Sequence, residues 1–519
     1  MQITSRTCEA CAQRERHAGV TCRRARRSEA WVPVWAVVAT AVAIGLASPR
    51  AVVAEQTSRP PNVILFLIDD LGWTDLGCYG SSFYETPHID RLAASGLRLT
   101  NGYAACTVCS PTRAAILTGK YPARLHLTDW IAGHQRPYAK LRLPPWRQYL
   151  PHEETTLAEM LADRGYVTCH VGKWHLGDEA YWPTTQGFQY NIGGNHRGQP
   201  PSYFFPYERP DIPLPGLSRG MPGEYLTDRL TDEALAFIDK HQDRPFFLYF
   251  AHYAVHTPLQ AKADKIGKYQ AKARPDQPQR NATYAAMIES VDESVGRVMA
   301  RLETLQLRDQ TIVIFTSDNG GLELNQVTDN APLRAGKGSA YEGGVRVPWI
   351  IAYPPLVAPG SVSDTPIMSI DVLPTLWELC SVRPGTPPPC DGVSLVPLLR
   401  KPGHSFNRPL FWHYPHYHPG GATPYGAVRQ GDWRLVEFYE DGRLELYNLR
   451  EDLGESRDLA ATHPEKRDEL HRLLKEWRTA VGAQMPTPNP DYDPARDQAP
   501  RAKKGKAAKT STGKSEAGR

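Results

Sequence analysis

The sequence predicts an α/β protein with a large mixed, mostly parallel sheet flanked by helices, followed by a smaller C-terminal antiparallel sheet with one helix. Three segments, 62–68 (NVILFLI), 245–250 (PFFLYF) and 311–316 (TIVIFT), are continuous apolar runs. That pattern is typical of strands buried on both faces of a parallel sheet. From about residue 401 the runs become short and alternating, as at 433–438 and 443–447, and a polar helical stretch follows at 464–481. Alternation indicates strands with one buried face, so this part predicts the antiparallel sheet.

Length and composition divide the 519 residues into several segments. The chain is too long for one ordinary hydrophobic core, so we predict a large α/β domain over 55–400 and an α+β subdomain over 401–492. Residues 493–519 are basic and rich in Ala, Ser, Gly and Pro, and we expect this tail to be disordered. The formal net charge is only +4, with the excess near both ends, which gives no support for a nucleic-acid partner.

The N-terminal segment 1–54 reads as a leader. Its first thirty residues are basic and polar, an apolar run follows at 31–47, and the small residues of 52–54 (VVA) offer a cleavage site. This order predicts a secretory signal with a long basic region, and hence export to the periplasm or the medium. The alternative is an N-terminal membrane anchor. We expect no stable membrane span in the mature chain.

Nine cysteines occur, and three of them lie in the leader, which leaves six in the mature chain. Cys380 and Cys390 flank a Pro-rich turn, so we expect a local disulfide there in an oxidising compartment. Cys78 and Cys169 are expected to be buried thiols. The pair Cys106 and Cys109 needs separate treatment because of its spacing.

Polar residues follow two of the buried runs at the point where each run ends. Asp69 and Asp70 come directly after 62–68, and Asp318 and Asn319 follow the strand at 311–316 one residue later. Ligands of open α/β sheets bind beyond the carboxyl ends of strands, so these ends can meet in one crevice. Singly, each Asp could be a helix N-cap or a turn residue. Together they are hard oxygen donors, which suit calcium or magnesium.

The segment 106–121 (CTVCSPTRAAILTGKY) ends a loop and opens a helix. Its C-x-x-C pair alone favours a redox disulfide or half of a zinc site. Pro111 suits the first turn of a helix, and a group at Cys109 would face a helix N-terminus, which favours an anion. Arg113 adds a fixed charge one turn on.

The run CSPTR at 109–113 resembles the signature of the formylglycine-dependent sulfatases of the alkaline phosphatase superfamily. Further motifs at 172–177 (GKWHLG), 254–258 (AVHTP), 334–338 (RAGKG) and 370–375 (IDVLPT) resemble that family in chain order, over about 62–459. The resemblance implies an alkaline phosphatase-like fold. It also implies that a formylglycine-generating or equivalent maturation enzyme oxidises Cys109 to an aldehyde, whose hydrate is the nucleophile.

The same resemblance implies a role for each matched position. Asp69, Asp70, Asp318 and Asn319 would hold one calcium ion together with an oxygen of the modified Cys109. Arg113 would add positive charge, Lys173 would contact the formylglycine and the sulfate, and His175 would bond its hydroxyl. His256 and Lys337 would bind the sulfate and the bridging oxygen. A lone Lys or His at such a position would otherwise be a surface charge or a core histidine.

These observations predict a sulfuric ester hydrolase that acts on a sulfate monoester. We expect a carbohydrate sulfate, because the mature chain shows no apolar membrane-facing hairpin for a lipid or steroid sulfate. The alternatives are a phosphate or phosphonate ester hydrolase of the same superfamily, a non-catalytic sulfated-glycan-binding protein, and a C-x-x-C oxidoreductase. We expect the segment 411–418 (FWHYPHYH) to be a loop rich in aromatic and imidazole side chains, which either lines the pocket through His413, His416 or His418 or packs between domains. Polar stretches at 197–219 and 262–280 are candidate walls.

Overall fold

The computed structural model describes residues 59–207, 209, 212–380 and 386–497. The predicted leader therefore lies outside the described residues. Of the predicted tail, residues 498–519 also lie outside the described residues. Residues 494–497 form a short helix, and Asp497 of that helix binds Arg136 with an N–O distance of 2.5 Å. The described residues belong to one compact unit.

The main sheet has eight strands, of which seven run in one direction and β9 runs opposite to both of its neighbours. In spatial order the strands are β10 (Ser361–Ser363), β2 (Leu97–Leu99), β9 (Trp349–Ala352), β8 (Thr311–Ser317), β1 (Asn62–Ile68), β7 (Phe246–Ala251), β5 (Val167–Gly172) and β6 (Tyr190–Ile192). The central strand β1 pairs in parallel with β8 and β7, in a register that sets Ile68 beside Ser317 and Leu67 beside Ala251. The carboxyl ends of these three strands therefore lie at the same edge.

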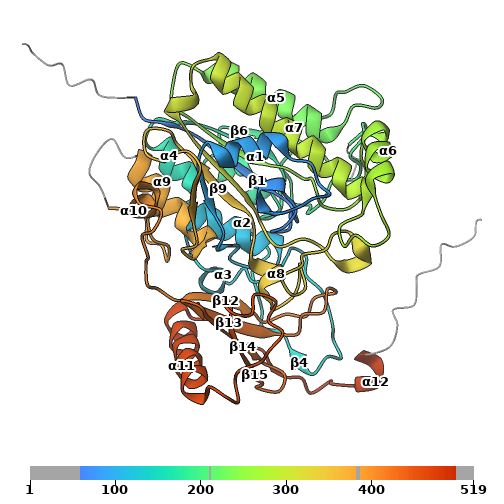
Figure 1. Cartoon of the computed structure of the whole chain (residues 1–519), viewed down its shortest axis with the longest axis vertical. Coiled ribbons are helices and arrows are strands. Elements are labelled where there is room, and N and C mark those ends of the chain that lie inside the picture. The colour runs from blue at the N-terminus through green and yellow to red at the C-terminus, as the bar shows by residue number, and fades with distance from the viewer. Residues whose placement is uncertain (1–58, 208, 210–211, 381–385, 498–519) are drawn as a thin grey trace, which may run out of the picture. The chain divides into compact units, whose positions relative to one another are not determined.

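Helices cover both faces of this sheet (Figure 1). One face packs against α1 (Pro87–Ala94), α5 (Leu226–His241), α6 (Ala263–Lys272) and α7 (Ala282–Thr304). The other packs against α2 (Cys109–Thr118), α4 (Leu157–Ala162), α9 (Val372–Cys380) and α10 (Val396–Arg400). Ile64 and Phe66 point to the first layer and Val63 and Leu65 to the second, and all are fully buried. Burial on both faces is why the run has no polar alternation.

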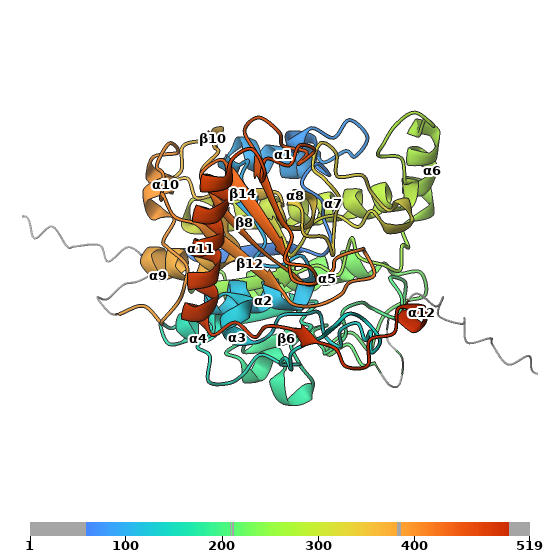
Figure 2. The same ribbon diagram turned by 90° about the horizontal axis from the view of Figure 1, so that it is seen from below.

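The C-terminal sheet is antiparallel and lies below the large sheet in Figure 1. Its strands follow one another in space as β12 (Leu410–Tyr414), β13 (Tyr425–Gln430), β14 (Trp433–Phe438) and β15 (Leu444–Asn448). Helix α11 (Pro464–Val481) runs along this sheet (Figure 2) and buries Leu470, Leu474 and Trp477. The Trp477 ring stacks on Phe411 with centroids 4.8 Å apart. The short elements are β3 (Gly102–Tyr103), β4 (Leu141–Arg142), β11 (Ile367–Met368), β16 (Thr487–Pro488), α3 (Pro122–Leu125), α8 (Glu342–Val345) and α12 (Pro494–Asp497).

The predicted fold class is confirmed, and three local expectations are corrected. Cys78 is only partly buried, not buried as expected. Cys380 and Cys390 are both free thiols rather than a disulfide, as are the other cysteines within the described ranges. Burial of Cys380 inside α9 keeps its thiol in the apolar layer. The segment 411–418 is not a loop, because its first half belongs to β12.

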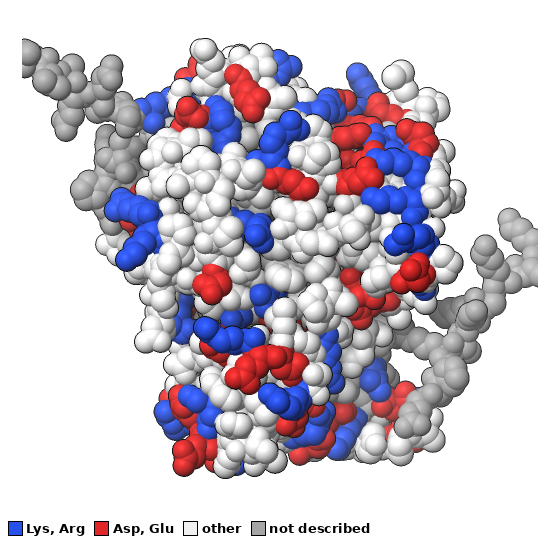
Figure 3. Space-filling view, viewed as in Figure 1, with Lys and Arg blue, Asp and Glu red and all other residues white. Residues whose placement is uncertain are grey.

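Charges of both signs are mixed on the face drawn in Figure 3, most densely over α6. Lys265 there binds Glu289 at 2.7 Å and Glu293 at 2.5 Å, which ties α6 to α7. Such mixing gives this face no broad field of one sign. In the part of the chain that the structure covers, no helix has the length and apolar character needed to cross a bilayer.

Candidate active site

Four polar side chains meet where β1 and β8 end. Asp69 and Asp70 follow β1, Asp318 and Asn319 follow β8, and all four are buried. The parallel register brings the two ends together, so that the Asp70 backbone N–H donates to Asp318 Oδ1 at 3.3 Å and Asn319 Nδ2 donates to Asp70 Oδ1 at 2.8 Å. Asp70 adopts φ 63°, a left-handed conformation that Asp tolerates better than most residues. The predicted convergence of these side chains is therefore present.

Cys109 is the first residue of α2, directly in front of the free N–H groups of that helix. Every residue of α2 is buried, including Arg113, which lies one turn further on. The Arg113 guanidinium binds Asp318 Oδ2 at 2.9 and 2.7 Å and donates to the Lys173 carbonyl at 2.8 Å. Burial raises the pKa of the Cys109 thiol, and the charges of Lys173 and Lys337 oppose that rise. Cys109 is therefore a protonated thiol in the unmodified chain at neutral pH.

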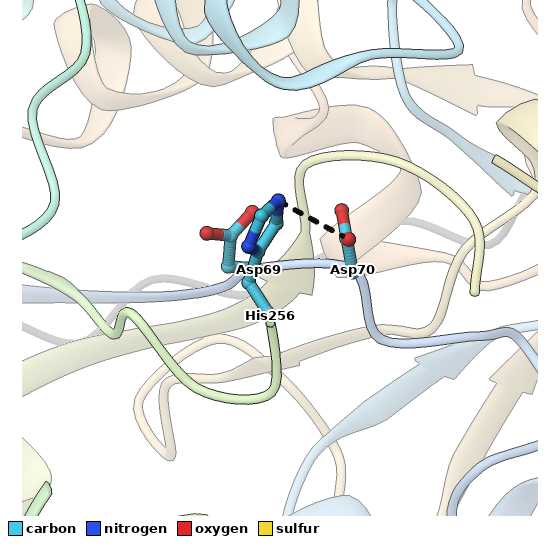
Figure 4. A group of neighbouring side chains, drawn as sticks. All are labelled: Asp69, Asp70 and His256. Atoms are coloured by element: carbon cyan, nitrogen blue, oxygen red, sulfur yellow. Dashed lines mark ion pairs between the residues drawn. The ribbon is translucent and has the colours of Figure 1, made fainter. Parts of the chain in front are cut away.

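Three basic side chains face the strand-end carboxylates. Lys173 Nζ lies 2.7 Å from Asp69 Oδ2, and Lys337 Nζ lies 2.6 and 2.9 Å from the two oxygens of Asp70. His256 Nε2 lies 3.6 Å from Asp70 Oδ2, and its ring lies beside Asp69 (Figure 4). Burial raises the pKa of Asp69 to about 8 despite Lys173. Burial acts the same way on Asp70, but Lys337 and His256 outweigh it and hold the pKa of Asp70 below its usual value.

His175 faces Cys109 with one nitrogen and the backbone with the other. Its Nδ1 lies 3.3 Å from Cys109 Sγ, while Nε2 is in short contact with the Ile131 carbonyl. A carbonyl can only accept, so Nε2 carries the proton and Nδ1 presents a lone pair to position 109. Burial, together with Lys173, lowers the pKa of His175 well below its usual value, which keeps the ring neutral.

The donor set fits a hard cation. Asp69 Oδ1 and Asn319 Oδ1 are buried without a hydrogen-bond partner among the described residues. Buried polar atoms are normally satisfied, so two orphaned oxygens in one acidic cluster indicate a missing partner. Asp69, Asp70 and His256 also offer ligand atoms within 4.8 Å of one another. The proximity of His256 adds a nitrogen donor that the oxygen-only prediction lacked.

A pocket of about 540 Å³ opens over this cluster. Of the predicted residues, Cys109, His175, His256 and Lys337 line it, while the other basic groups, Lys173 and Arg113, are fully buried. Its remaining polar or aromatic lining consists of Trp130, His196, Arg197, Gln199 and His418. The candidate wall at 197–219 thus contributes through Arg197 and Gln199, whereas none of the lining comes from 262–280. Trp130 and His196 had no signal in the sequence, because neither belongs to a motif.

The three histidines of the aromatic segment have different surroundings. His413 lies 2.8 Å from Tyr439 Oη and 2.9 Å from the Gln484 carbonyl, and His416 lies 2.8 Å from Thr128 Oγ1. Both are buried, but only His416 contacts the large domain, since Tyr439 and Gln484 belong to the same C-terminal subdomain as His413. His418 alone of the three lines the pocket. Both interpretations of the segment are therefore right, each for a different residue.

The loop that carries Lys337 is held by the C-terminal sheet. Arg434 of β14 donates to the Ala340 carbonyl at 2.7 Å and binds both Glu342, at 3.3 Å, and Glu455. The Glu342 backbone N–H donates to Glu455 Oε2 at 2.7 Å. These residues are fully buried. The smaller sheet thus fixes a segment of the active-site wall.

Comparisons with known proteins agree with this geometry. The sequence model of the sulfatase family matches residues 61–382, and that of the N-sulphoglucosamine sulphohydrolase C-terminal region matches 336–480. A sulfatase of Formosa agariphila is 33% identical over 500 residues, covering 82% of this chain and 89% of its own. Human arylsulfatase A is 36% identical over 422 residues, covering 74% and 76%. The crystal structure of Ps i-CgsB in complex with k-i-k-neocarrahexaose has 29% identity and a TM-score of 0.69, and the match covers 85% of this chain and 98% of that one.

Proposed function

The chain belongs to the sulfatase family and hydrolyses sulfate esters, and on that premise we propose that it desulfates a carbohydrate with a formylglycine made from Cys109 and one calcium ion. The observation that carries the proposal is the position of Cys109. It lies at a helix N-terminus in a pocket lined by Lys337 and His256, with the His175 lone pair 3.3 Å from its sulfur. A sulfate monoester is an anion that resists attack by another anion, so its hydrolysis needs such a cationic site.

The modified residue would supply two hydroxyl groups on one carbon, one to attack sulfur and one whose loss of a proton lets sulfate leave. A serine or cysteine lacks the second hydroxyl and would be left as a stable adduct. His175 is placed to accept that second proton, because its Nδ1 lone pair faces position 109. The Ile131 carbonyl holds the ring in this tautomer.

Positive charge around the pocket would stabilise the transition state. Arg113, Lys173 and Lys337 are fixed before reaction by their contacts with Asp318, Asp69 and Asp70. Charge that is preorganised in this way is usually the largest contribution to catalysis. Lys337 and His256 line the pocket and would bind the bridging oxygen, where one of them donates a proton to the departing alcohol.

Calcium would be held by Asp69, Asp70, Asp318 and Asn319 with an oxygen of the modified Cys109. Bound there, it would neutralise sulfate charge and lower the pKa of the attacking hydroxyl. The orphaned oxygens of Asp69 and Asn319 support this assignment. The acidic residues also offset the cost of gathering three cationic side chains in one buried cluster.

A carbohydrate substrate is supported by the polar lining of the pocket. Imidazoles at His175, His196, His256 and His418 and the amide of Gln199 suit sugar hydroxyls, and the indole of Trp130 suits a sugar face. Ps i-CgsB, which shares this fold, was crystallised with k-i-k-neocarrahexaose. We further expect export of the chain, and maturation of Cys109 by a formylglycine-generating or equivalent enzyme.

Peptide mass spectrometry and paired kinetics test the proposal. Position 109 of active enzyme should carry formylglycine, and hydrolysis of 4-nitrophenyl sulfate should exceed that of 4-nitrophenyl phosphate. Cys109→Ala should abolish turnover, whereas Cys106→Ala, its neighbour in the same buried segment, should lower stability more than turnover. An unmodified thiol at position 109 of active enzyme would refute the proposed mechanism. Preference for the phosphate ester would instead support the phosphohydrolase alternative, which the nitrogen donor of His256 favours.

A further inference from the structure

We propose that the natural substrate carries a second anionic group, a carboxylate or another sulfate, which binds Arg197 while the scissile sulfate binds at Cys109. The inference rests on the proposed function and narrows its substrate class to polyanionic sugars. It starts from the charge partners of the basic groups in and beneath the pocket.

Arg197 differs from the other basic residues at the site. Arg113, Lys173 and Lys337 each bind a buried carboxylate within 2.7 Å. Arg197 lines the pocket and is exposed, and no carboxylate of the described residues forms an ion pair with it. Its guanidinium is therefore available to a ligand, and its planar fork suits carboxylates and sulfate-like groups.

Among the described residues, no acidic side chain lines the pocket to compete for that guanidinium. Its charged lining residues are Lys337 and Arg197, and its titratable neighbours are imidazoles and the Cys109 thiol. The carboxylates at the strand ends, Asp318, Asp69 and Asp70, lie behind this surface. They are already paired with Arg113, Lys173 and Lys337, respectively. A concave surface lined by one sign of charge concentrates ligands of the opposite sign. One sulfate uses the cations near Cys109, so Arg197 stays available to a second anion.

The backbone that carries Arg197 is fixed against the reaction centre. Asn195 holds the segment, because its Oδ1 accepts from the Arg197 N–H at 2.8 Å and its carbonyl accepts from the His175 N–H at 3.0 Å. Gly198 packs on the His175 ring so closely that a Cβ would come within 2.5 Å of it. The backbone of Arg197 is therefore held next to His175. A group bound by Arg197 and the sulfate that reacts at Cys109 then belong to the same ligand.

The volume of the pocket leaves room for this second group. About 540 Å³ lies within the range of sites for ligands much larger than a sulfate, roughly 300–1,000 Å³. Sulfate itself has five heavy atoms, so most of the space is left for the alcohol. The aliphatic lining residues are Ile131, Ala132 and Leu322, and the indole of Trp130 adds a flat face.

The test compares Arg197→Gln with wild type on matched substrates. One pair is a sulfated uronate-containing disaccharide and its carboxyl-reduced form, and the second pair is a disulfated monosaccharide and its monosulfated form. A charge-assisted hydrogen bond predicts that Arg197→Gln lowers kcat/KM for the dianionic member about 10- to 100-fold more than for its monoanionic partner. Arg197→Lys should recover part of the difference. Arg219→Gln removes the same charge from an exposed residue outside the pocket lining and should change neither ratio.

The outcomes separate this inference from the function on which it rests. A loss confined to the uronate pair identifies a carboxylate, and one confined to the disulfated pair identifies a second sulfate. If Arg197→Gln slows both members of each pair equally, or wild type shows no preference for dianions, the inference is wrong. If wild type hydrolyses neither these sugars nor 4-nitrophenyl sulfate, the proposed function itself fails.

Discussion

Arg434 offers the sharpest test of how the two sheets cooperate. The substitution Arg434→Met keeps the apolar volume but removes the guanidinium that joins Glu342, Glu455 and the Ala340 carbonyl. Removing one partner of a buried ion pair costs about 3–5 kcal/mol, because the remaining charge is uncompensated. Two features of the site place the expected loss near the lower limit of that range.

The first feature is that Glu342 keeps other partners. It accepts from Tyr103 Oη at 2.7 Å and binds Arg346 at 3.2 Å. The second is that burial already raises the pKa of Glu455 to about 7, so this carboxyl can take up a proton when Arg434 is absent. We therefore expect a loss of about 3 kcal/mol in the free energy of unfolding. Urea denaturation followed by fluorescence measures it.

Activity should fall as well, although Arg434 does not line the pocket. Release of the Ala340 carbonyl frees the loop that positions Lys337, and small displacements of a catalytic group are costly. We expect kcat for 4-nitrophenyl sulfate to drop about tenfold under conditions where the variant is folded. Arg450→Met is the matched control, since its ion pair with Asp432 is mostly exposed, and it should lose less than about 1 kcal/mol.

The double variant Arg434→Met with Glu455→Gln should recover part of the lost stability, because it removes one unpaired buried carboxylate. A loss below about 1 kcal/mol for Arg434→Met alone, or no recovery in the double variant, would refute this account of the junction. Full activity in a destabilised Arg434→Met would refute its link to Lys337.

Three further predictions concern the site and its surroundings. Lys337→Met should lower kcat about 10²- to 10⁴-fold, and most for substrates with poor leaving groups, which a series of aryl sulfates would reveal. Chelation with EGTA should lower both activity and melting temperature, and calcium should restore both, because a ligand that binds only the folded state stabilises it. Burial raises the pKa of Asp129 to about 7 from an ordinary 3.8, so between pH 4 and 7 the folded state holds a proton that the unfolded state releases. Stability should therefore fall as pH rises through that window, by at most about 4 kcal/mol, and Asp129→Asn should flatten the decline in pH-dependent urea titrations.

Local patterns predicted the elements of this protein well. The run 62–68 is β1, and the polar stretch 464–481 is α11. A strand buried on both faces requires a continuous apolar run, and a helix buried along one side requires apolar residues at helical spacing, so both elements can be recognised from the sequence. The convergence of Asp69 and Asp70 with Asp318 also followed from sequence. Parallel strands end at the same edge, so their terminal residues converge once both strands are recognised.

Tertiary packing decided which side chains of the site contact one another. Sequence named Lys173, Lys337 and Arg113 as cations but gave no indication that each has its own carboxylate partner. It could not select His418 over His413 and His416 for the pocket, since three identical side chains in one segment differ only in what packs on them.

By itself, the sequence determined the fold class, the family signature at Cys109 and the strand ends that gather the acidic residues. Only the tertiary structure showed that Arg197 lines the pocket without a carboxylate partner among the described residues, and that Arg434 fixes the Lys337 loop. It also showed that Cys380 and Cys390 stay apart as thiols. The physical reason is the sequence separation of the contacts. Periodicity depends on which neighbouring residues are buried, whereas contacts between residues distant in the chain depend on strand register and packing.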